Sequence, residues 1–398
     1  MFATNYFEKN KKQALIAESP AHGTDLCVVI PCFREPDILH TLNSLNQCEL
    51  PGSPAEVIVL INHPEDASLE IIRHNKRTKK EIEAWVLKNQ REGLTFFAAG
   101  PVPLKKKWAG AGLARKTGMD EAIRRFQLIN NPEGILISLD ADTLTEKNYL
   151  TEIEKYFQNN PGSPGTTIAF SHQTTGITGK HLQGIRLYEK YMDYYRNALT
   201  FCGYPFPMFT VGSAFAVTAR AYVRRGGMNR RKAGEDFYFL QNLAQMGTIG
   251  EITGTTVHPS ARLSDRVPFG TGPVLQKWMQ GEQDLTKTYD FQSFIDLKQL
   301  FDQKEKLFQM EKEGFEAFIN SLPQPVTNFL LDSNFWNDVS DLNHNCAQLQ
   351  SFTSRFFQKF NAFKILKFLN YTHQYFYQKG TLEQQVERLS KCFPNFVG

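Results

Sequence analysis

The chain has 398 residues, of which 41% are hydrophobic and 22% charged, and its formal net charge is +4. This composition is typical of a globular protein that is long enough for a catalytic domain and a smaller appended domain. The charge is mild, and neither zinc-finger spacing nor an aromatic RNA-binding signature is present, so we expect no nucleic-acid partner. The six cysteines lack the paired spacing of a metal site, which favours reduced thiols in the cytoplasm. No apolar run approaches the roughly 18 residues of a membrane span, and residues 1–21 are too polar for a signal peptide.

Strands and helices alternate through the first two thirds of the chain. Apolar runs predict strands at residues 26–30, 57–61, 94–98, 135–139, 211–217 and 249–257. The segments between them predict helices at residues 36–48, 65–91, 113–126 and 237–246. Such alternation implies right-handed crossovers and a doubly wound, mainly parallel α/β sheet. Ligands bind such sheets at the carboxyl ends of the strands.

The predicted strand at 135–139 ends in two carboxylates one residue apart, Asp140 and Asp142. Acids at the end of a buried strand cost desolvation free energy unless a cation pairs with them. A divalent metal that carries a phosphorylated ligand meets this need, because one or two carboxylates suit Mg²⁺ or Mn²⁺. The alternative is that Asp142 and Thr143 cap a helix that begins near Glu146. Capping explains only one of the two acids, so we favour the metal site.

Two further groups of polar residues follow downstream. Glu235 and Asp236 open a predicted helix after Gly234, where acids are also common simply as partners of the helix dipole. His258 precedes a loop that contains Arg262 and Arg266. Arginine binds phosphate oxygens through paired donors, so this loop is a candidate for metal or phosphate contact.

Four segments together resemble glycosyltransferases of the GT-A fold, similar to family two. They are the sequence VVIPCFRE at 28–35, ARK at 114–116, DAD at 140–142 and GED at 234–236, and the resemblance covers roughly residues 24–275. It implies a Rossmann-like sheet and a metal-dependent enzyme that moves a sugar, expected to be a hexose, from a UDP- or GDP-sugar to a hydroxyl group. The acceptor would be a small molecule or a lipid-linked one.

The resemblance also implies roles for individual residues. Asp140 and Asp142 would bind Mn²⁺ or Mg²⁺ on the donor diphosphate, with Asp142 as the more direct ligand, and Asp236, beside Glu235, would activate the acceptor. Residues 258–272 are similar to enzymes that glycosylate glycerate or phosphoglycerate, which implies His258 as a metal ligand. Contacts to the donor would come from Pro31, Phe33, Glu35, Asn62, Arg115, Asp140, Arg262 and Arg266.

The chain departs from the family pattern at two positions. Asn62 stands where members usually carry an aspartate that touches the base or ribose, which leaves the choice of nucleotide open. Lys116 replaces the usual asparagine after the helical arginine, which we expect to change the charge near the diphosphate. Transfer would invert the anomeric configuration if Asp236 lies in line as a base. If the likeness to glycerate-type enzymes holds, the configuration would be retained and Asp236 would only position the acceptor.

Two other functions fit part of the pattern. The sequence from Asp140 to Thr143 also matches the start of haloacid-dehalogenase-type phosphatases, in which the first aspartate is a nucleophile. That motif normally lies on the first strand of its domain, whereas several strands precede it here. The second alternative is a non-catalytic nucleotide-sugar-binding protein of the same fold, which the departure at Asn62 suggests.

The predicted domains are an N-terminal extension at 1–23, a catalytic domain at 24–275 and a helical domain at 276–398. Between residues 342 and 382 the helical domain has no acidic residue, while five lysines and arginines are interspersed among ten aromatic residues. Such a stretch suits peripheral contact with an anionic membrane at the cytoplasmic face, the seam of a homodimer, or the core of a helical domain. We favour the core.

Overall fold

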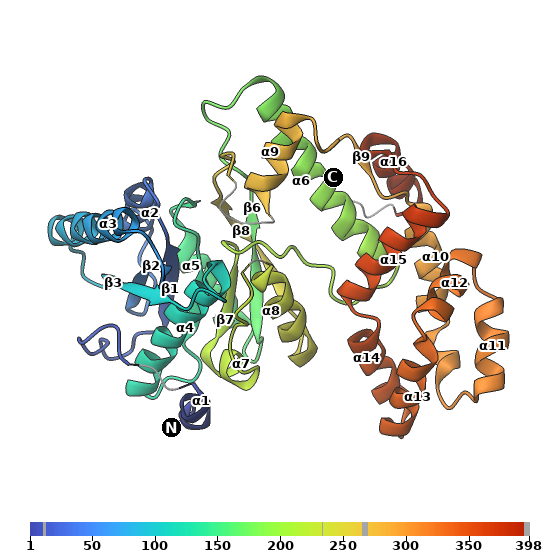
Figure 1. Ribbon diagram of the computed structural model, residues 1–398. Helices are drawn as coiled ribbons and strands as arrows, with labels where there is room; N and C mark the ends of the chain where they lie inside the picture. The colour runs from blue at the N-terminus through green and yellow to red at the C-terminus, as the bar shows by residue number, and fades with distance from the viewer. Residues whose placement is uncertain (11–12, 233, 265–269, 394–398) are drawn as a thin grey trace. The chain divides into compact units, whose positions relative to one another are not determined.

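The computed structural model describes residues 1–10, 13–232, 234–264 and 270–393, and contacts divide the chain into two compact units (Figure 1). The sheet unit comprises Met1–Thr178 and Thr210–Gln276, and the helical unit comprises Gly179–Phe209 and the chain from Lys277 onward. The predicted fold class, an α/β fold with a mainly parallel sheet and an appended helical region, is confirmed. The helical unit also contains α6 (Gly179–Phe201), which lies within the segment 24–275 predicted as the catalytic domain. The proposed domain boundaries stay a prediction.

The sheet has the strand order β3-β2-β1-β4-β7-β6-β8-β5. Its first half is parallel and consists of β1 (Leu26–Cys32), β2 (Ala55–Pro64), β3 (Leu94–Leu104) and β4 (Ile135–Ser138). In its second half, β7 (Phe215–Thr218) is antiparallel to β4 and to β6 (Gly165–Phe170), while β8 (Gly250–His258) is parallel to β6 and antiparallel to β5 (Leu144–Thr145). Because β1 and β4 are central neighbours, the residues that follow them lie at the same edge of the sheet.

The two faces of the parallel half are covered by different helices. Alternate residues of β1 and β2 pack into a hydrophobic core with α2 (Ile38–Asn46), α3 (Leu69–Lys88) and α5 (Tyr149–Asn159). On the other face, α4 (Ala111–Leu128) approaches β1 closely at Gly118, where an added Cβ would lie 2.5 Å from Val29. A glycine there lets the helix lie directly on the strand. The remaining helices of this unit include α1 (Thr4–Lys9), α7 (Ala219–Arg224), α8 (Glu235–Leu243) with a 3₁₀ turn at Ala244–Met246, and most of α9 (Thr271–Gln280).

A buried ion pair links α4 to β2. The guanidinium of Arg125 donates to both carboxylate oxygens of Glu56 at 2.5 and 2.6 Å, and both side chains are almost fully buried. We expect Arg125→Met to destabilise the protein by about 3–5 kcal/mol, because it leaves an uncompensated carboxylate in the interior. Urea denaturation measures this loss. The double variant Arg125→Met with Glu56→Leu should recover most of it, and an equally unstable double variant would contradict this account.

The N-terminal segment, predicted as an extension, packs against α4. Tyr6 of α1 donates a hydrogen bond to Asp120 at 2.6 Å, and Glu121 accepts from the backbone N–H groups of Leu15 and Ile16 at 3.1 and 3.3 Å. The side chains of Asp120 and Glu121 are both buried. The extension therefore belongs structurally to the sheet unit.

Several elements differ from their predicted lengths. β3 continues through two prolines to Leu104, beyond the expected end at residue 98, and β1 passes through Pro31, which lies beyond the register with β4 and pairs with β2. The strand predicted at 211–217 begins only at Phe215, because Gly212 and Ser213 form a turn. The long helix expected at 65–91 is shorter, with Ser68 as its N-cap.

The helical unit is built on an aromatic core. Its elements include α6, α10 (Gln292–Asp302), a 3₁₀ turn at Lys304–Leu307, α11 (Lys312–Asn320), α12 (Gln324–Asp332), α13 (Phe335–Asn345), α14 (Leu349–Lys359), α15 (Ala362–Tyr375), α16 (Leu382–Cys392) and the short pair β9 (Lys287–Thr288) with β10 (Gly380–Thr381). Phe352, Phe356, Phe360 and Phe368 are fully buried, as the favoured interpretation of this stretch requires. Within the described residues, no helix is long and apolar enough to cross a membrane.

Candidate active site

Arg115 of α4 joins segments that are far apart in the sequence. Its guanidinium donates to Asp140 after β4 at 2.8 Å, to Glu235 of α8 at 3.3 Å and to the carbonyl of Gly212 at 3.0 Å. It also donates to the hydroxyl of Ser138 at 2.5 Å, which in turn donates to the Gly212 carbonyl. The Arg115 side chain is only 3% exposed. This buried cation therefore fixes the strand end and the start of α8 relative to each other.

Glycine at position 112 allows this approach. A Cβ there would lie 2.2 Å from the carbonyl oxygen of Arg231 and 2.9 Å from the Cβ of Glu235. Any side chain would separate α4 from the loop that leads into α8. Neither Gly112 nor the small polar residue Ser138 was among the predicted site residues, although a serine inside an apolar strand was a visible signal for the latter.

Arg115 is one cation surrounded by three carboxylates. Asp140, Glu235 and Asp236 all interact electrostatically with this one guanidinium. Burial and the neighbouring Glu235 raise the pKa of Asp236 to about 7, and burial also raises the pKa of Glu235. The Asp236 side chain is partly exposed and accepts a hydrogen bond from the N–H of Phe237 at 2.7 Å. An accessible carboxylate that titrates near neutrality is suited to accept a proton.

A second arginine, Arg262, forms ion pairs with acids that follow β1 and β4. Arg262 forms a bidentate pair with the buried Glu35, lies 2.7 Å from Asp142 and lies 3.7 Å from Asp37. The sequence predicts a phosphate contact for Arg262 and a donor contact for Glu35. In this structure the two bind each other.

The predicted metal ligands do not form a cluster. Asp140 bonds to Arg115, Asp142 to Arg262, and His258 through Nδ1 to the carbonyl of Ser171 at 2.9 Å. In the part of the chain that the structure describes, no three His, Cys, Asp or Glu side chains are arranged to hold a metal ion. The donor atoms themselves fit Mn²⁺ or Mg²⁺, because carboxylate oxygens and an imidazole nitrogen are suitable ligands. Asp140 and Asp142 also keep 39% and 23% of their side-chain surface exposed.

The capping alternative for Asp142 is wrong. The helix that follows, α5, begins at Tyr149, its N-cap is Asn148, and the short strand β5 lies between it and Asp142. Asp142 therefore has no capping role, and its described partner is Arg262.

Lys116 is located differently from what was expected. Its ammonium group lies 2.5 Å from the hydroxyl of Tyr6 and 3.2 Å from Asp120, and its side chain is buried. Consecutive residues of a helix point in different directions, so Arg115 and Lys116 serve different sides of α4. We expected Lys116 to add positive charge near a diphosphate bound beside Arg115. Its charge is instead offset by Asp120.

The remaining predicted donor contacts lie after β1 and β2. Pro31 ends β1 together with Cys32, and Phe33 follows in a partly exposed turn. Asn62 is buried, and its amide nitrogen donates to the carbonyl of Cys32 at 3.0 Å, so it ties β2 to the end of β1. Arg266 lies outside the described residues.

Comparisons with known proteins give similarity in structure alone. No family model matches the chain, and no curated protein matches it. One similar solved structure is TarS from S. aureus (residues 1–349) in complex with UDP-GlcNAc, at 13% identity over 76% of this chain and 83% of that chain, with a TM-score of 0.42. Another is the mannosyltransferase PcManGT from Pyrobaculum calidifontis in complex with GDP-Man and Mn²⁺, at 13% identity over 89% of this chain and 93% of that chain, with a TM-score of 0.39. Likeness at this level assigns no activity, so the function must be inferred from the residues of the site.

Proposed function

We propose that this chain is a metal-dependent glycosyltransferase that moves a hexose from a UDP- or GDP-sugar to a hydroxyl group of a small-molecule or lipid-linked acceptor. The observation that supports this most directly is the Arg115 network. It brings Asp140, after a central parallel strand, together with Glu235 and Asp236 at the start of α8. Sugar transfer needs these two functions in one place, an acid that holds the donor and a base for the acceptor.

On the donor side, Asp140, Asp142 and His258 would hold Mn²⁺ or Mg²⁺. When bound, the metal would neutralise the negative charge that accumulates on the departing diphosphate. Arg115 orients the carboxylate of Asp140 through its 2.8 Å hydrogen bond. Pro31, Phe33, Glu35 and Asn62 would form the side of the site that receives the nucleotide, and Arg262 and Arg266 would approach its phosphates.

On the acceptor side, Asp236 would take the proton from the attacking hydroxyl group. Its pKa is raised to about 7, close to the operating pH that suits a general base, and the ionised carboxylate is the form that accepts the proton. Glu235 contributes by raising this pKa while it stays bonded to Arg115. In-line attack would invert the anomeric configuration. Retention would instead assign Asp236 a positioning role.

The two alternatives are less well supported by this geometry. A phosphatase would need Asp140 as a nucleophile, but the hydrogen bond from Arg115 holds electron density on that carboxylate and weakens it for attack. A purely binding protein has no need for a carboxylate that titrates near neutrality at the same edge of the sheet.

Thermal stabilisation tests the proposal. The full chain is heated with UDP, GDP and their sugar derivatives, each with and without MnCl₂. A ligand that binds the native state raises the midpoint by mass action, so we expect one nucleotide class to do so only with Mn²⁺, together with slow hydrolysis of its sugar nucleotide. No stabilisation by any nucleotide would contradict the proposal. Phosphate release from simple esters without a sugar nucleotide would favour the phosphatase.

A further inference from the structure

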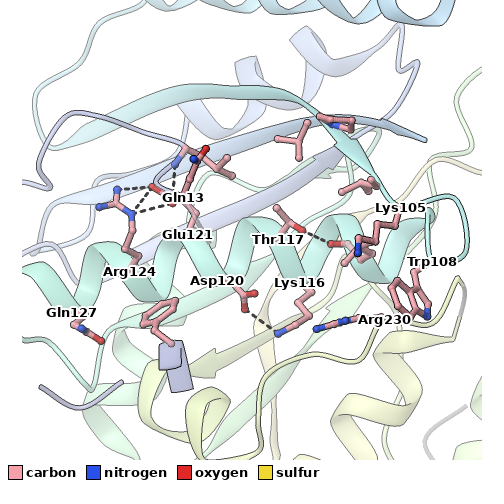
Figure 2. Close-up of a pocket in the computed structure, with 16 residues that line it drawn as sticks. Gln13, Lys105, Trp108, Lys116, Thr117, Asp120, Glu121, Arg124, Gln127 and Arg230 are labelled. Atoms are coloured by element: carbon pink, nitrogen blue, oxygen red, sulfur yellow. Dashed lines mark hydrogen bonds and ion pairs between the residues drawn. The ribbon is translucent and has the colours of Figure 1, made fainter. Parts of the chain in front are cut away.

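A groove of about 690 Å³ follows α4 (Figure 2). Its floor is formed by α4 residues spaced three or four apart, among them Leu113, Lys116, Thr117 and Asp120. This spacing places them on one face of the helix, whereas Arg115 projects from the opposite face. The groove lies entirely within the sheet unit, and its volume falls in the range of small-molecule sites.

One end of the groove is cationic. Lys105, Trp108 and Arg230 lie together there, and the guanidinium of Arg230 is 5.4 Å from the centre of the Trp108 ring. Lys105 and Arg230 are exposed, and within the described residues neither forms an ion pair. The other cations of the groove are neutralised, because Lys116 pairs with Asp120 and Arg124 pairs with Glu121 at 2.6 Å.

One wall of the groove is apolar, whereas its far end combines apolar residues with Gln13, Glu121, Arg124 and Gln127 (Figure 2). Val102 and Leu104 of β3 face Leu113 of α4, and Phe7 and Leu15 of the N-terminal segment contribute further apolar surface. Covering this surface with an alkyl chain is favourable, because it removes apolar area from water. Trp108 is less suited to stack a nucleotide base, because Lys107 lies 5.3 Å and Arg230 5.4 Å from its ring centre.

We propose that this groove binds an anionic amphiphile. Its phosphate or carboxylate head group contacts Lys105 and Arg230, and its alkyl chain lies along the wall formed by Val102, Leu104 and Leu113. Charge complementarity at the cationic end and apolar surface along the wall beside it select for a molecule with one acidic head and one chain. The site is separate from Asp140 and Asp236 and requires no sugar transfer.

Calorimetry of the full chain with dodecyl phosphate, kept below its micelle concentration and without nucleotide, tests the site. We expect binding of one molecule per chain. The double variant Lys105→Gln with Arg230→Gln should weaken it by about tenfold or more, because both charge-assisted contacts to the head group are lost. The matched control is Lys76→Gln with Lys80→Gln on α3, which removes the same charge from exposed positions outside the groove. Equal affinities in the two double variants would overturn the proposal.

Three further ligands and one variant separate the head group from the chain. Dodecanoate should bind if a carboxylate suffices, and its failure to bind would assign the head group as phosphate. Dodecyltrimethylammonium has the same chain with the opposite charge and should bind much more weakly. Leu113→Asn should weaken dodecyl phosphate but leave binding of inorganic phosphate unchanged. Inorganic phosphate that binds as tightly as dodecyl phosphate, or a cationic amphiphile that binds equally well, would contradict the proposal. These experiments measure binding alone. If the amphiphile does not bind, the proposed transferase activity is not affected.

Discussion

Replacing Asp236 with asparagine is expected to lower the rate of sugar transfer by about 100-fold to 10,000-fold, which is the usual contribution of a positioned base. Asparagine has nearly the same shape but cannot accept the proton. Affinity for the donor should stay close to that of the parent, because Asp140, Asp142 and Arg115 are unchanged. Steady-state kinetics with the nucleotide sugar that stabilises the protein measures both quantities. Near-normal turnover would move the role of base to another residue.

The pH dependence distinguishes a lost base from a damaged fold. Only ionised Asp236 can accept a proton, and its pKa is raised to about 7, so kcat/KM of the parent should rise as the pH increases through about 7. The residual activity of Asp236→Asn should lack this rise. Glu152→Gln is a suitable control, because Glu152 also lies in the first turn of a helix, α5, away from Arg115. A control with the same loss of activity would indicate a general effect of removing such an acid.

Replacing Asp142 with alanine is expected to abolish nucleotide binding that depends on Mn²⁺ while leaving the protein folded. The carboxylate lies after β4 and is partly exposed, so its loss creates no large cavity, and Arg262 keeps its bidentate pair with Glu35. Calorimetric titration with the preferred nucleotide, with and without Mn²⁺, measures the effect, and circular dichroism checks the fold.

A neighbouring acid provides the matched control for this variant. Asp37 lies 3.7 Å from the same arginine, Arg262, but its side chain is 54% exposed and it does not follow a central strand. Asp37→Asn should therefore keep the Mn²⁺-dependent binding. If Asp142→Ala binds the nucleotide with Mn²⁺ as the parent does, the metal site must lie elsewhere.

The sequence by itself determined the parallel half of the sheet and the positions of its acids. The apolar runs that form β1, β2 and β4 are buried on both faces, which is the local pattern that identifies a parallel strand. Asp140 and Asp142 follow the last of these runs, and Glu235 and Asp236 begin a helix after a glycine. Each of these features depends on neighbours in the chain, so periodicity and helix-start signals were sufficient to predict them.

Only the tertiary structure decided which side chains meet. The pairing of Arg115 with Asp140 and Glu235, and of Arg262 with Glu35 and Asp142, joins residues from separate crossovers, and no local pattern specifies such partners. A buried carboxylate requires a cation, but the sequence offered both a metal and several arginines for that role. The packing of α4 against β1 at Gly118 placed one arginine at the strand end, whereas the pairing of Lys116 with Asp120, four residues apart, follows from the helix itself. Close approach in three dimensions, rather than order along the chain, therefore determined how the charges of this site are balanced.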